Sequence, residues 1–149
     1  MAVTGASATE RAMMTGSTVI PCLRYRDAKY MIGWLRDAFG FRLQAVYEDG
    51  SGGIAHAQLT LGSGMIMLGS LREDDQFGKV QSIPAALGGT TQSPYLVVAD
   101  ADAIYRSAIA AGAEIVIEIK DEDYGGRGFS CRDPEGHLWN VGNYDPWEK

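Results

Sequence analysis

The order strand–helix–strand–strand–strand is predicted twice along this chain of 149 residues. The first predicted helix follows Asp27 and the second follows Asp100 or Asp102, and each of these side chains can cap a first helical turn. The helices end at Gly40 and Gly112, because glycine tolerates the left-handed conformation at a helix C-terminus. The two halves share order and spacing rather than residue identities. This pattern predicts an internal duplication of one small unit.

Apolar runs separated by glycine-rich turns give the bounds of the expected elements. Pro21 lies inside the first expected strand and predicts an edge position or a bulge, because proline has no backbone N–H to donate. In the first half we expect strands at 18–23, 41–47, 54–61 and 65–68, with the helix between 27 and 40. In the second half we expect strands at 95–98, 114–119, 127–131 and 137–143, with the helix ending at 112.

These elements predict one α+β domain made of two βαβββ modules. A flexible N-terminal tail (1–17) precedes the domain (18–149). The domain divides into module 1 (18–70), a linker (71–92), module 2 (93–143) and a C-terminal tail (144–149). The linker carries an acidic run, a proline and three glycines, and we expect one helical turn in it. A connection of this length in a compact domain usually covers a site or crosses to another subunit.

Composition limits the partners of the chain. The formal net charge is −6 and the pI is about 4.8, so nucleic acid and anionic membranes are unfavourable partners, whereas a cationic small molecule is attracted. No apolar run approaches the roughly 18 residues of a membrane span. Residues 1–17 lack the basic-then-apolar order of a signal peptide. We therefore expect a cytoplasmic protein in which the two cysteines are not obliged to pair.

Three local segments, taken in this order, resemble the vicinal oxygen chelate superfamily, which comprises glyoxalases, bleomycin-resistance proteins and extradiol dioxygenases. They are 23–27 at the entry to the first helix, 110–115 at the exit from the second, and Asp133-Pro134-Glu135-Gly136-His137 at the last hairpin. The resemblance covers residues 18–147. It implies two half-barrels that form an eight-stranded cup around a small-molecule pocket. It also implies a homodimer, in some members with modules exchanged between chains.

Members of this superfamily that use a metal take four ligands, of the histidine or glutamate type, from the first and last strand of each module. Here the corresponding positions fall near Ile20, at Met67 or Leu68, near Pro94 and at Asn140. Aliphatic, thioether and proline side chains do not hold a hard divalent cation, and one asparagine is a poor ligand. We therefore expect neither a bound metal nor another cofactor.

The candidate ligand-binding residues lie on strands and near one loop. His56 and Gln58 share one face of the third strand, and this face looks into the pocket, at solvent or at a subunit partner. Tyr124 and Arg127 flank a Gly-Gly loop at the expected pocket mouth. The aromatic residues Phe129 and Trp139 lie on strands of the second half, where they either line the pocket or pack in the core. The full set of candidates is His56, Gln58, Met67, Tyr124, Arg127, Phe129, Trp139 and Asn140.

Three functions are consistent with the resemblance. The one we expect is a non-catalytic binder of a cationic or aromatic small molecule, which sequesters an antibiotic or a metabolite. The alternative is a metal-dependent glyoxalase-like isomerase or lyase, or an extradiol-type dioxygenase, and it requires His56 to converge with Glu48, Glu118 or Asp123. A metal-free enzyme with His56 or Tyr124 as acid or base is the third. No catalytic residue is assigned.

Overall fold

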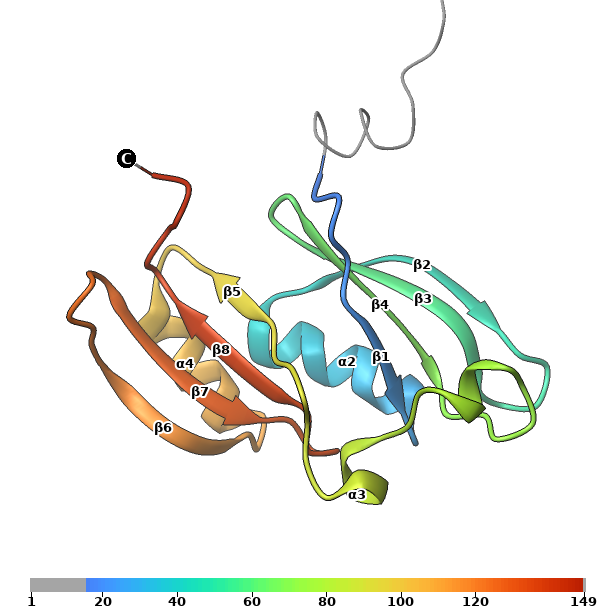
Figure 1. Ribbon diagram of the computed structural model, residues 1–149. Coiled ribbons are helices and arrows are strands. Elements are labelled where there is room, and N and C mark those ends of the chain that lie inside the picture. Colours follow the sequence, from blue (N-terminus) through green and yellow to red (C-terminus); the bar gives the residue numbers. More distant parts are fainter. Residues whose placement is uncertain (1–15, 149) are drawn as a thin grey trace, which may run out of the picture.

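The computed structural model describes residues 16–148 and contains two four-stranded sheets that do not close into a barrel (Figure 1). The α+β architecture and its two modules agree with the prediction. Most of the predicted N-terminal tail (1–17) lies outside the described residues. Module 1 contains β1 (Cys22–Tyr25), α2 (Ala28–Phe39), β2 (Arg42–Glu48), β3 (Ile54–Leu61) and β4 (Gly64–Ser70). Module 2 contains β5 (Tyr95–Val97), α4 (Ala101–Ala110), β6 (Glu114–Asp121), β7 (Arg127–Arg132) and β8 (Leu138–Gly142).

The two sheets have the same topology. Their strand orders are β1-β4-β3-β2 and β5-β8-β7-β6, and in each sheet the first strand pairs in parallel with the last while the other pairs are antiparallel. In Figure 1 the sheets stand side by side, with α2 and α4 behind their strands. The duplication predicted from the order of elements is therefore present in the pairing of the strands.

Both long helices are capped as their flanking residues predict. The side chain of Asp27 accepts a hydrogen bond from the backbone N–H of Tyr30 at 3.1 Å, and that of Asp100 accepts from Ala103 at 3.0 Å. Of the two aspartates considered for the second helix, Asp100 is thus the cap. Gly40 stops α2 in the left-handed region with φ of 87°. The two aspartate caps satisfy backbone N–H groups of the first helical turn that would otherwise lack an intrahelical partner.

One hydrophobic core is shared by the two modules. The rings of Phe39 and Phe41 pack against Trp139 of β8, with centroids 5.3 and 6.0 Å apart. Two hydrogen bonds join the helical segments directly: the indole N–H of Trp34 donates to the Ala111 carbonyl at 2.7 Å, and the Ser107 hydroxyl donates to the Ala38 carbonyl at 2.6 Å. These contacts fix how the two sheets sit relative to each other.

The structure differs from the prediction mainly in the first strand and in the linker. β1 begins at Cys22 instead of residue 18, because Pro21 takes part in the sheet only through its carbonyl, which accepts from Met67. The linker holds two short helical segments, η1 (Phe77–Lys79) and α3 (Pro84–Leu87), where one turn was expected. Within residues 16–148 no helix is long and apolar enough to cross a membrane.

Candidate functional site

Each sheet has a core face and an open face. In β1, Leu23 and Tyr25 are buried against the helix, so the alternate residues Cys22 and Arg24 point the other way. From His56 to Thr60 the same alternation holds in β3, where Ala57 and Leu59 are buried and the residues between and beside them are half-buried, as the sequence predicts. The open face of module 1 thereby carries Cys22, Arg24, His56, Gln58, Thr60, Met65 and Met67.

A hollow of about 310 Å³, the module 1 hollow, lies on this open face and is partly covered by the linker. The strand register pairs Arg24 of β1 with Gly69 of β4, and His56 of β3 borders the same hollow. Gly69 has no side chain, and the guanidinium of Arg24 lies directly against it, since a Cβ at this position would lie 2.8 Å from Nη1. Linker residues close one side of it. The principal lining residues are Arg24, His56, Met67, Gly69, Phe77 and Gln81.

A chain of polar contacts orients His56. The side-chain amide of Gln58 donates through Nε2 to Oε1 of Gln44 at 2.6 Å. This hydrogen bond leaves Oε1 of Gln58 directed toward His56. His56 Nε2 lies 2.9 Å from that oxygen, so Nε2 carries the proton in this arrangement. The ring also lies near Tyr47, with centroids 6.1 Å apart. Nδ1 of His56 is therefore the nitrogen left for a further partner.

Arg24 belongs to this hollow, although the sequence analysis did not select it. Its guanidinium lies over the Phe77 ring at 5.2 Å and donates to the Ser70 carbonyl and, through Nε, to Gln81. Within residues 16–148 no carboxylate lies within 4.0 Å of it. The available signal was the alternation with Leu23 and Tyr25, which places a charged side chain on the face opposite the core.

A second hollow of about 460 Å³, the module 2 hollow, lies on the open face of the other sheet. Tyr95, Tyr124 and Tyr144 surround it: the Tyr124 and Tyr144 rings meet edge to face at 4.9 Å, and Tyr95 donates to the Tyr144 carbonyl at 2.7 Å. Partial burial, and secondarily Tyr124, raises the pKa of Tyr95. Asn140 on β8 is held by the Ser130 hydroxyl at 2.7 Å. Sequence reasoning found Tyr124 and Asn140 but missed the other two tyrosines.

The remaining candidates lie on the core side of their strands. Trp139 is 0% exposed, and its indole N–H donates to Asp133, so its ring offers no surface to a ligand. The Phe129 ring packs on Tyr105 of α4 at 5.0 Å. For both residues the structure corresponds to the core-packing alternative, although Phe129 also borders the module 2 hollow. The ligand-binding role of Phe129 stays a prediction.

Arg127 is neutralised by two acidic side chains. Its Nη1 donates to Asp121 at 2.8 Å and its Nη2 donates to Asp102 at 3.4 Å, while its Nε lies 3.3 Å from Asp102 without a hydrogen bond. The hydrogen bond with Asp121, followed by the charge of Asp102, raises the pKa of Arg127. The guanidinium is therefore engaged at the edge of the module 2 hollow rather than free to receive a ligand carboxylate.

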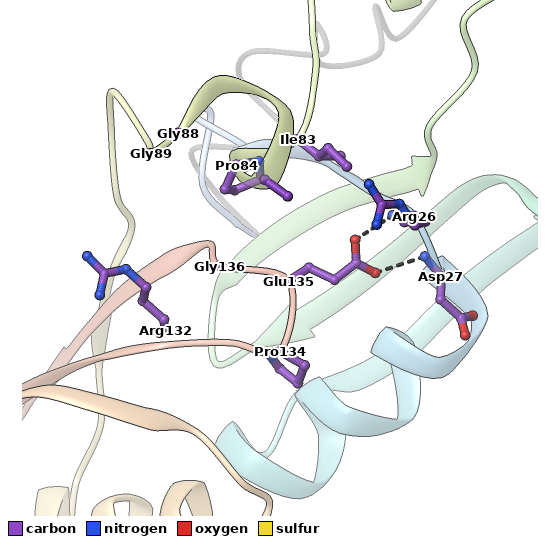
Figure 2. A pocket seen from close by; sticks show the side chains of 11 residues that line it. Arg26, Asp27, Ile83, Pro84, Gly88, Gly89, Arg132, Pro134, Glu135 and Gly136 are labelled. Atoms are coloured by element: carbon purple, nitrogen blue, oxygen red, sulfur yellow. Dashed lines mark hydrogen bonds between the residues drawn. The ribbon is translucent and has the colours of Figure 1, made fainter.

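A third hollow, of about 630 Å³, lies between α3, the turn before α2 and the hairpin that joins β7 to β8 (Figure 2). Glu135 reaches across it, and its carboxylate accepts the backbone N–H groups of Arg26 and Asp27 at 2.5 and 2.8 Å. Both carboxylate oxygens are thus used to join the modules. This hollow marks the junction between modules and does not lie on an open face.

The side chains at the family-type ligand positions do not suit a hard divalent ion. Met67 and Asn140 lie on different open faces, and Asn140 is already bound by Ser130 and Ser93. In the part of the chain that the structure describes, no three His, Cys, Asp or Glu side chains gather into a possible metal site. His56 does not converge with Glu48, Glu118 or Asp123 in such a group. The absence of a metal stays a prediction.

Known protein sequences include a family and two curated proteins that match this chain. The model of the Glyoxalase/Bleomycin resistance protein/Dioxygenase superfamily matches residues 16–141. An uncharacterized protein of Mycobacterium bovis is 35% identical over 94 residues, which cover 61% of this chain and 59% of that protein. An uncharacterized protein of Mycobacterium tuberculosis is equally similar, with 53% of its length covered. The chain therefore spans little more than half the length of the curated relatives it matches.

Solved structures show the same architecture. TioX from Micromonospora sp. ML1 superposes with a TM-score of 0.68 and 32% identity over 87% of this chain and 100% of that one. The fosfomycin resistance protein FosX from Listeria monocytogenes, solved with manganese and a dihydroxypropylphosphonic acid, superposes with a TM-score of 0.62 over 87% of this chain and 92% of its own. Its identity of 13% supports a shared fold alone.

Proposed function

Because this chain belongs to the Glyoxalase/Bleomycin resistance protein/Dioxygenase superfamily, we propose that it binds a small organic molecule on the open faces of its modules without changing it chemically. The observation that carries the proposal is the pair of hollows, each lined by polar and aromatic side chains with defined partners. Small-molecule sites are typically concave and largely apolar, with a few positioned polar groups. Sequestration of an antibiotic or a metabolite is the corresponding role.

The aromatic lining supports an aromatic ligand. Tyr95, Tyr124 and Tyr144 present rings and hydroxyls at the module 2 hollow, and Phe77 presents a ring at the module 1 hollow. Tyr124 is 63% exposed and Phe77 is 59% exposed. Aromatic rings that are held in place but uncovered can stack on a planar ligand at low entropic cost. The two hollows are the sites where such stacking is available.

A homodimer is part of this proposal. Within one chain the open faces of the two modules form separate hollows. His56 and Met67 line the module 1 hollow, and Tyr124 and Asn140 line the module 2 hollow. A second copy could place its module 2 over module 1 and enclose the ligand on both sides. Light scattering coupled to size-exclusion chromatography measures this directly, with a dimer mass expected. A cytoplasmic location is proposed with it, in keeping with Cys22 and Cys131 being free thiols.

A thermal-shift screen together with metal analysis tests the function. A ligand that binds the folded state alone raises the Tm by mass action, so we expect a rise with aromatic drugs or metabolites and none with divalent metals or glutathione adducts. The protein should be purified without a histidine tag, so that any metal measured is its own. Stoichiometric, tightly held metal would overturn the proposal in favour of a metal-dependent isomerase, lyase or dioxygenase.

A further inference from the structure

We infer that the module 1 hollow binds an anionic group of the ligand, such as a carboxylate, sulfonate or phosphonate, with Arg24 as its principal contact. This inference rests on the proposed small-molecule function and adds a chemical class to it. It starts from a half-buried guanidinium that points into a hollow of about 310 Å³. Buried or partly buried cations are normally paired with an acid or with another acceptor of comparable strength.

The contacts of Arg24 are weak for a charge in this position. Its two hydrogen bonds go to neutral oxygens, of Ser70 at 3.3 Å and of Gln81 at 3.4 Å. The salt bridges of residues 16–148 involve other arginines, and none of them joins Arg24 to an acid. Phe77 covers one face of the guanidinium and so holds it in place without neutralising it. An anion from outside would supply the missing partner.

Gly69 keeps the approach to the guanidinium open. A Cβ at this position would come within 2.8 Å of Arg24 Nη1 and within 2.9 Å of the Ala55 carbonyl oxygen. Because glycine stands there, Arg24 lies close against β4, and His56 lines the same hollow. The Gln44–Gln58 pair engages Nε2 of His56 and leaves Nδ1 for a ligand.

The charged lining of the hollow is positive on balance, because it contains two arginines, Arg24 and Arg72, and one carboxylate, Asp75. Asp74 pairs with Arg72 at 3.4 Å, and Asp75 accepts the backbone N–H of Gly78 at 2.7 Å. The net charge of −6 favours a cationic ligand for the molecule as a whole. Charges beyond about 8 Å are largely screened at physiological salt, however, so an adjacent guanidinium outweighs them at contact. The net charge of the molecule therefore predicts a preference for cationic ligands at this site, whereas Arg24 predicts a preference for anionic ligands.

A matched pair of fluorescent probes separates these expectations. Anilinonaphthalenesulfonate and N-phenylnaphthylamine share one aromatic scaffold, and only the first carries a negative charge. We expect the wild-type protein to bind the sulfonate more tightly than the neutral probe. The preference should weaken with added salt, because an ion pair at a partly exposed site is screened. Apolar surface alone would give no such preference.

Variants assign the preference to Arg24. Arg24→Gln should lower the affinity for the sulfonate by about tenfold and leave the neutral probe within about twofold, since hydrogen bonds to charged groups contribute on that scale. Arg24→Lys should retain most of the preference. Arg106→Gln, on the exposed side of α4, makes the same change in net charge away from the hollow and should alter neither affinity.

Four outcomes overturn the inference, and one of them also overturns the function. If both probes bind wild-type protein equally, or if Arg24→Gln and Arg106→Gln behave alike, the small-molecule function stands and the anionic assignment fails. If neither probe binds, both fail. Circular dichroism checks that Arg24→Gln is folded; were it unfolded, the salt dependence of the wild-type preference would decide, and a preference independent of salt would refute the assignment.

Discussion

The hydroxyl of Tyr25 lies 2.6 Å from Oδ2 of Asp133, and this contact joins the first strand of module 1 to the last hairpin of module 2. Both side chains are buried, with 0% and 4% of their surface exposed. The same Oδ2 accepts the indole N–H of Trp139 at 3.0 Å, and Oδ1 accepts the backbone N–H groups of Glu135 and His137. A buried carboxylate that is satisfied in this way holds the two modules in a fixed arrangement.

Tyr25→Phe should destabilise the protein by about 1–3 kcal/mol, because it removes one donor from a buried, charged acceptor. Urea unfolding, followed by far-ultraviolet circular dichroism, measures the loss. Tyr30→Phe is the matched control, since Tyr30 on α2 is 56% exposed and should change the free energy of unfolding by less than about 0.5 kcal/mol. Equal effects in the two variants would contradict a special role for the contact between Tyr25 and Asp133.

Stability should fall at high pH because of the same tyrosine. Burial, followed by the charge of Asp133, raises the pKa of Tyr25 well above its ordinary value. In the unfolded chain a tyrosine loses its proton near pH 10, whereas the folded chain retains it. The stabilisation is complete below about pH 10 and is lost as pH rises further, at about 1.4 kcal/mol per pH unit.

Tyr25→Phe removes that slope. The stability difference between wild type and Tyr25→Phe should therefore shrink as pH rises above about 10. Burial also raises the pKa of the Cys131 thiol, to about 12, and this adds a decline that begins near the ordinary pKa of a thiol and that both proteins share. The measurement is the free energy of unfolding in urea at several pH values. Parallel curves for the two proteins would show that Tyr25 does not titrate differently in the folded state.

The elements were predictable where the signals are local. The bounds of β3 agree with the predicted strand 54–61, since hydrophobic alternation between two turns defines it. The Asp27 cap and the Gly40 stop were found because each depends on one residue and its own backbone. The start of β1 was wrong because the apolar run 18–23 continues across Pro21, while the pairing with β4 begins after it.

The site was predictable only in part, because it depends on which face each strand buries. Trp139 and Asn140 are adjacent in β8 and therefore point to opposite faces, so both could not line one hollow. Strict use of this alternation would have assigned Trp139 to the core. Arg24 was missed because the predicted strand stopped one residue before it. The contact between Arg24 and Phe77 joins segments far apart in the chain, and no local pattern indicates it.

The two cysteines should react very differently with alkylating reagents. Cys22 is exposed, whereas Cys131 is buried and its pKa is raised to about 12, so at neutral pH its thiolate is scarce as well as covered. Iodoacetamide followed by mass spectrometry should label one site in the native protein and two in denaturant. Cys22→Ser should abolish native labelling. Rapid native labelling of Cys131 would show that the core around β7 opens readily.

Two glycine substitutions should change stability in opposite directions. A Cβ at Gly33, an exposed position inside α2, meets nothing within 4 Å, so Gly33→Ala should stabilise the protein by about 0.5–1 kcal/mol through the higher helix propensity of alanine. Gly69→Ala should destabilise it by about 1–3 kcal/mol, because the Ala55 carbonyl oxygen, 2.9 Å away, belongs to backbone that cannot easily move. Urea unfolding of both variants measures the difference. A neutral Gly69→Ala would mean that β3 and β4 can separate there, and the close packing of Arg24 against β4 would then not need glycine.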